Sequence, residues 1–116
     1  TGMFVGTSAN VNQATGIFCG LSVNIGGPDT VDIIKVVNGA QSGLPISQSL
    51  GSPVMMTAYR LRLTQRGGMW TCEALVGSTP ITVSTTLTAT APLYITLRND
   101  NMGSNFHSVV AESKLP

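Results

Sequence analysis

Charged residues are scarce in this chain. Only 9% of its 116 residues are Asp, Glu, Lys or Arg, whereas a typical soluble domain contains about 25%. The formal net charge of +1 gives none of the strong positive potential that nucleic-acid-binding domains carry. Aromatic residues make up only 5% of the chain, which disfavours base stacking on a sheet. We therefore expect no nucleic-acid partner, and so weak a net charge does not oppose self-association.

Groups that carry catalysis or bind metals are also few. The single histidine, His107, lies in a segment that alternates with apolar residues, and no nucleophile, base and orienting residue can be grouped around it. Asp29, Asp32 and the Asn99-Asp100-Asn101 cluster offer oxygen donors of the kind Ca²⁺ uses. Asp and Asn are, however, also ordinary turn formers, and we adopt that interpretation. We expect a protein that is not an enzyme and holds no cofactor and no metal.

Long apolar runs and glycosylation acceptors are missing too. No run approaches the roughly 20 residues that a membrane span requires, and no Asn-x-Ser/Thr sequence occurs. The polar residues are mainly Ser, Thr, Asn, Gln and Gly, a composition common in secreted, cell-surface and particle-forming β proteins. We expect an extracellular or virion-surface location, with residues 1–116 forming one domain of a longer protein.

The clearest pattern in the chain covers residues 59–76, YRLRLTQRGGMWTCEALV. Two runs with period-2 alternation flank Arg66-Gly67-Gly68, which predicts a β-hairpin. A register slip of one residue would turn every side chain to the opposite face, so the pattern predicts which side chains point inward. The expected inner face holds Tyr59, Leu61, Leu63, Trp70, Cys72 and Ala74, and the outer face holds Arg60, Arg62, Thr64, Thr71 and Glu73.

Short alternating or β-branched segments occur along the rest of the chain, separated by turn signals. No segment carries a 3.6-residue period, so we expect almost no helix. Eight or nine short strands at this spacing are typical of an antiparallel β-sandwich or a barrel. Residues 39–53 form the longest irregular segment, which has room for a short edge strand. The other expected strands are 3–8, 16–24, 31–37, 81–88, 93–98 and 106–112.

The two cysteines leave an alternative open. Cys19 and Cys72 both lie on the apolar face of their segments, where they can form a disulfide. A buried free cysteine also behaves as a small apolar residue, so two reduced thiols in the core fit equally well.

Two family resemblances begin at the hairpin. The segment GGMWTCEA (67–74) is similar to the one around the second cysteine of immunoglobulin-like domains, although the tryptophan expected about a dozen residues after Cys19 is absent. The strand YRLRL, the glycine turn, APLYITL (91–97) and the final F-x-S-V-V strand (106–110) together resemble concanavalin A-like or laminin-G-like jelly rolls. That resemblance implies glycan or ligand binding by a sheet face or by loops. Viral and phage surface domains share this architecture.

The sequence thus predicts a lectin-like recognition domain that binds a glycan or a protein receptor and forms homo-oligomers. The alternative is a self-associating structural subunit such as a capsid protrusion, a spike or a fimbrial subunit. The exposed polar residues of the hairpin either pair across the strands or form a platform for a ligand. The candidate ligand-binding residues are Arg60, Arg62, Glu73, Tyr94, Arg98, Asn99, Asp100 and Asn101.

Overall fold

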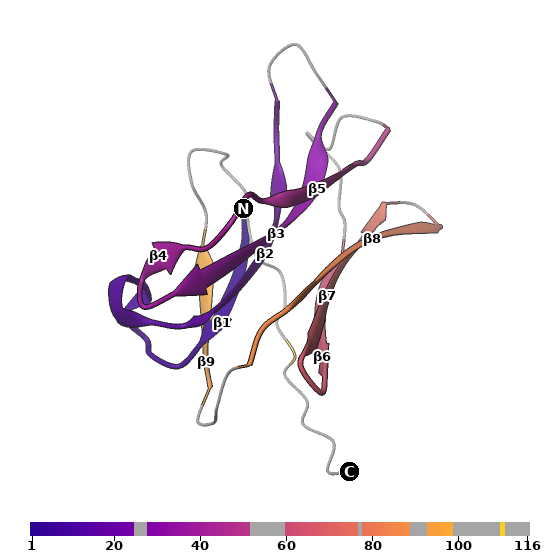
Figure 1. Cartoon of the computed structure of the whole chain (residues 1–116). Helices are drawn as coiled ribbons and strands as arrows, with labels where there is room; N and C mark the ends of the chain where they lie inside the picture. Colours follow the sequence, from indigo (N-terminus) through magenta and orange to yellow (C-terminus); the bar gives the residue numbers. More distant parts are fainter. Residues whose placement is uncertain (25–27, 52–59, 77, 89–92, 99–109, 111–116) are drawn as a thin grey trace.

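The computed structural model describes residues 1–24, 28–51, 60–76, 78–88, 93–98 and 110. These residues form nine strands and one 3₁₀ turn, arranged as two antiparallel sheets (Figure 1). The predicted all-β fold with almost no helix is confirmed. The elements are β1 (Gly2–Gly6), η1 (Val11–Gln13), β2 (Gly16–Ser22), β3 (Thr30–Val37), β4 (Ala40–Gln41), β5 (Ile46–Ser49), β6 (Arg60–Arg66), β7 (Met69–Val76), β8 (Thr79–Thr86) and β9 (Tyr94–Arg98).

The first sheet, sheet A, has the strand order β4-β3-β2-β1-β9, and β5 pairs with the other half of β3. The second sheet, sheet B, is the meander β6-β7-β8. The chain therefore enters sheet B after β5 and returns to sheet A with β9, which lies beside β1. Figure 1 shows the two sheets as facing layers.

The predicted hairpin is β6 and β7, and its register is the expected one. Arg62 lies opposite Glu73, and Leu63 lies opposite Cys72. The turn is made by Gly67 and Gly68, and Gly67 has a φ of 60°, a left-handed conformation that glycine adopts without steric cost. The period-2 pattern of the sequence thus sets which side chains of sheet B face the core.

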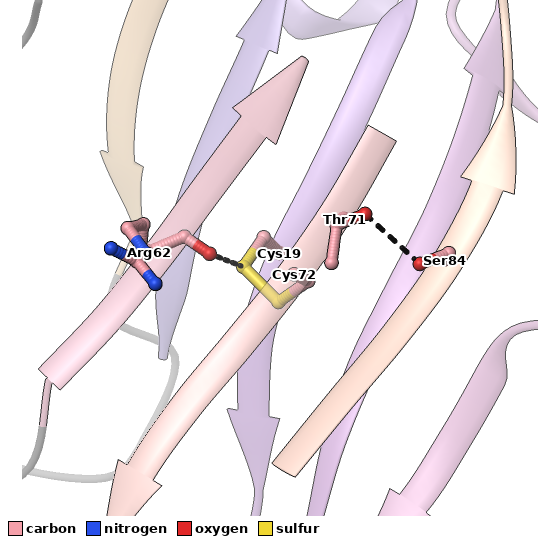
Figure 2. Close-up of a disulfide and its surroundings, with 5 residues drawn as sticks. All are labelled: Cys19, Arg62, Thr71, Cys72 and Ser84. Carbon is pink, nitrogen blue, oxygen red and sulfur yellow. Dashed lines mark hydrogen bonds between the residues drawn. A yellow bond between two sulfur atoms is a disulfide. The ribbon is translucent and has the colours of Figure 1, made fainter. Parts of the chain in front are cut away.

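The core lies between the sheets. Sheet B contributes Trp70, Cys72, Ala74 and Val83, and sheet A contributes Ile17, Cys19, Leu21, Val31 and Ile33, all of them buried. A disulfide between Cys19 of β2 and Cys72 of β7 crosses this core (Figure 2). The paired form of the two cysteines is therefore the one present.

A second apolar cluster lies on the outer face of sheet A. It contains Phe4, Ala14 and Val36, with Val11, Phe18 and Ile34 packed against it. Phe4 and Phe18 lie opposite each other on β1 and β2, and each is flanked by glycine pairs, Gly2 with Gly20 and Gly6 with Gly16. A β-carbon added to Gly20 would lie 2.5 Å from Cζ of Phe18, and one added to Gly6 would lie 2.5 Å from Cε1 of Phe4. The phenyl rings therefore lie over the glycines.

The edge strands show where the expectations were incomplete. The irregular segment 39–53 contains two short strands, β4 and β5. In β9, Ile95 and Leu97 lie opposite Val5 and Met3, as their predicted inward direction requires. They are nevertheless 48% and 39% exposed, because the described strands of sheet B pack against β2, β3 and β5. Of the predicted strand 106–112 the structure describes Val110 alone, which is in no strand and is 79% exposed; its other residues lie outside the described ranges.

Candidate ligand groove on sheet A

A groove of about 500 Å³ lies on the outer face of sheet A. Its floor is apolar, and its rim carries amide, hydroxyl and guanidinium groups. Ligand sites of this kind combine an apolar lining with a few polar groups that fix orientation. The lining residues are Phe4, Val11, Asn12, Phe18, Ile34, Val36, Gly39, Gln41, Thr96, Leu97 and Arg98.

The floor depends on the glycines beneath the two phenyl rings. Phe4 is 2% exposed, whereas Phe18 is half-buried. Because glycine leaves no side chain under the rings, they lie close to the backbone. Phe4 is covered by its neighbours in the cluster, whereas Phe18 keeps part of its surface exposed. Aromatic rings present a large apolar contact area at low conformational cost.

One side of the rim is positioned by η1. Asn10 caps this turn: its side-chain Oδ1 accepts a hydrogen bond from the backbone N–H of Asn12 at 3.1 Å. The Gly39 amide donates to the Ala14 carbonyl at 2.8 Å, which ties η1 to the β3–β4 turn. Gly39 has a φ of 81°, and a β-carbon there would lie 1.8 Å from the Asn12 carbonyl oxygen. Only glycine fits this contact, so Asn12 is held beside the turn that leads to Gln41.

The other side of the rim is β9. Thr96 lies opposite Phe4, and Arg98 lies opposite Gly2, so both follow the outer face of sheet A. Thr96 is half-buried and Arg98 is exposed. The groove therefore has a guanidinium group at one end and the amides of Asn12 and Gln41 on the side formed by η1 and β4.

The residues predicted from the sequence fall on two different faces. Tyr94 and Arg98 lie on the outer face of sheet A, and Arg98 lines the groove. Arg60, Arg62 and Glu73 lie on the outer face of sheet B, on the opposite side of the sandwich. The structure does not bring these two sets together. The remaining candidates, Asn99, Asp100 and Asn101, lie outside the described residues.

Arg62 and Glu73 form the cross-strand pair that was one of the two interpretations of this face. Nη2 of Arg62 lies 2.9 Å from Oε1 and 3.1 Å from Oε2 of Glu73. The Arg62 side chain is 65% exposed, and exposed pairs of this kind stabilise a fold by under about 1 kcal/mol.

Several groove residues were not singled out from the sequence, among them Phe4, Asn12, Phe18 and Gln41. One signal for the floor is visible in retrospect. The pattern Gly-x-Phe-x-Gly occurs twice, as GMFVG at 2–6 and GIFCG at 16–20. Two such segments paired in antiparallel register place both rings side by side over four glycines. The rim residues carry no comparable signal, because they meet through contacts between distant segments.

The two aspartates considered for a metal have local roles. One Asp32 carboxylate oxygen accepts a hydrogen bond from the Ser22 hydroxyl. Oδ1 of Asp29 accepts a hydrogen bond from the backbone N–H of Asn24 at 3.2 Å. Both carboxylates are buried beside the β2–β3 connection. Within the described ranges, no three His, Cys, Asp or Glu side chains gather as a metal-binding group.

The described residues contain no helix of the length and apolarity that crossing a bilayer requires. No protein-family model, curated protein or solved structure matches this chain.

Proposed function

We propose that this protein is a non-enzymatic recognition domain that binds a glycan in the groove on the outer face of sheet A. The observation that carries the proposal is the combination of an apolar floor, in which the Phe18 ring is partly exposed, with Asn12, Gln41 and Arg98 on the rim. A sugar ring has one face of C–H groups, which packs on an aromatic ring, and hydroxyls around its edge. Planar amide and guanidinium groups hydrogen-bond such hydroxyls in fixed directions.

The setting proposed for this domain is the surface of a virus or phage particle or of a secreted protein. The low charge and the disulfide support it, because disulfides persist mainly in oxidising environments. The concanavalin A-like or jelly-roll type is part of the same proposal. It is supported by the two facing antiparallel sheets and by the return of β9 to sheet A after β8.

The groove is tested by a glycan array followed by titration of the best ligand against variants of the rim. Gln41→Ala should weaken the affinity about three- to tenfold, which corresponds to the loss of one neutral hydrogen bond. Arg98→Ala should weaken it about tenfold or more, because a charged donor is lost. Gln48→Ala is the matched control, since Gln48 is an exposed glutamine on β5, outside the groove.

Two results would contradict this assignment. The first is the absence of binding across a broad panel of sugars. The second is binding that Gln41→Ala and Gln48→Ala weaken equally, because the ligand would then lie elsewhere on the surface.

A second candidate function, a self-associating structural subunit, is favoured by one observation. Among the described strands β9 is at an edge of sheet A, and its residues Tyr94, Ile95 and Leu97 are 46%, 48% and 39% exposed. Unpaired edges with apolar side chains are templates for pairing with another copy. Light scattering over a wide concentration range tests this: we expect a mass that rises toward a dimer, and that Ile95→Lys keeps the protein monomeric. A strictly monomeric wild-type protein at all concentrations would rule the candidate out.

A further inference from the structure

The outer face of sheet B concentrates the positive charge of the chain. Arg60, Arg62 and Arg66 all point outward from β6, and they are three of the six basic residues of the whole protein. Glu73 is the one acidic residue in β6, β7 and β8. We call this surface the arginine face.

The spacing along β6 makes the arginine face an extended row. Residues two apart on a strand are about 7 Å apart, so Arg60 and Arg66 are separated by about 20 Å. Glu73 neutralises Arg62. Arg60 and Arg66 are exposed and have no acidic partner among the described residues.

Hydroxyl groups lie in the middle of the arginine face, whose two ends also carry the apolar residues Met69, Leu75 and Pro80. Thr64, Thr71 and Ser84 form one row across the three strands, and Thr82 lies beside Glu73. The Thr71 and Ser84 hydroxyl oxygens are 3.0 Å apart (Figure 2). The face thus pairs a line of guanidinium groups with neutral donors and acceptors.

We propose that the arginine face binds a sulfated polysaccharide. Guanidinium groups form paired, charge-assisted hydrogen bonds with tetrahedral oxyanions, and a linear polymer with repeated sulfate groups can engage Arg60, Arg62 and Arg66 together. The neighbouring hydroxyls match the sugar hydroxyls between the sulfates. This site lies on the opposite side of the sandwich from the groove, so it does not depend on the glycan proposed there.

The composition of the arginine face favours a polysaccharide over single-stranded nucleic acid. Proteins that bind single strands stack bases on exposed aromatic rings. Trp70 is the one aromatic residue in β6, β7 and β8, and it is 2% exposed and faces the core. Bases would find no stacking platform on this face.

Glu73 provides the sharpest test. If the ligand is a polyanion, Glu73 opposes it by holding Arg62 and by adding a negative charge. Glu73→Gln should then strengthen binding. If the face instead binds neutral sugar hydroxyls, Glu73 acts as an acceptor, and its replacement should weaken binding.

The experiment is heparin affinity chromatography of the full chain, together with titration of heparin at low and physiological salt. Arg60→Ser with Arg66→Ser should weaken the affinity at low salt about tenfold or more, because two charge-assisted contacts are lost. Glu73→Gln should elute at higher salt than the wild type. Lys35→Ser removes one positive charge from sheet A and is the control for net charge; it should elute close to the wild type. Circular dichroism confirms that each variant is folded.

Three results would overturn the proposal. They are unchanged elution of the double arginine variant, weaker binding by Glu73→Gln, and an equal loss with Lys35→Ser. Preference for a single-stranded oligonucleotide over heparin in a direct competition would overturn it as well, because the partner would then be a nucleic acid.

Discussion

Replacing both Cys19 and Cys72 with alanine should lower the free energy of unfolding by about 4 kcal/mol. The disulfide joins residues that are 53 positions apart, so it removes much of the conformational freedom of the unfolded chain. Both cysteines are fully buried in the core, and the alanines also leave unfilled space there. Urea unfolding followed by circular dichroism measures the change.

A control separates the cross-link from the packing of the side chains. Wild-type protein unfolded under reducing conditions loses the covalent bond and keeps the sulfur atoms. Its free energy of unfolding should therefore fall by most of the amount measured for the double variant. A loss under about 1 kcal/mol in both cases would show that the disulfide does not constrain the unfolded state as its long loop implies.

Trp70→Ala should lower the free energy of unfolding by about 3–5 kcal/mol. Trp70 is the largest of the fully buried side chains in the described residues, and it belongs to β7, the strand that also carries the disulfide-bonded Cys72. Its indole Nε1 also donates a hydrogen bond to the Leu87 carbonyl at 2.9 Å. The substitution removes both the apolar contacts and the partner of that carbonyl, and urea unfolding measures the sum.

Trp70→Phe is the companion variant, and it keeps the measurement informative if the alanine variant does not fold. Phenylalanine retains most of the apolar contact and removes the hydrogen bond, so the loss should be about 1–3 kcal/mol. A stability unchanged in both variants would contradict the core position of Trp70.

The hairpin is the part of the fold that the sequence predicted most fully. Polar and apolar residues alternate in 59–64 and 70–74, and only one register puts Leu63, Trp70 and Cys72 together on the inner face. That register also places Arg62 opposite Glu73, as observed. Local patterns suffice to predict this strand register, because a two-glycine turn fixes which residues of the two strands lie opposite each other.

The groove could not be predicted in the same way. β1 and β2 carry apolar residues on both faces, so alternation does not reveal that Phe4 and Phe18 point away from the core. The rim requires η1, β4 and β9 to meet, and those segments are far apart in the sequence. The disulfide was undecided for the same reason, because sequence spacing does not give the 5.4 Å separation of the two Cα atoms.

The four glycines under the phenyl rings have a consequence for how this surface can vary. A β-carbon on Gly6 or Gly20 would lie 2.5 Å from a ring carbon of Phe4 or Phe18, so it would displace that ring. A β-carbon on Gly2 or Gly16 would first meet a backbone carbonyl oxygen of the paired strand, at 2.3 Å or 2.2 Å. The position of the two rings is therefore set from beneath, by Gly6 on β1 and Gly20 on β2, where side chains are missing. A substitution at these positions can change the shape of the groove without altering any atom of the rim.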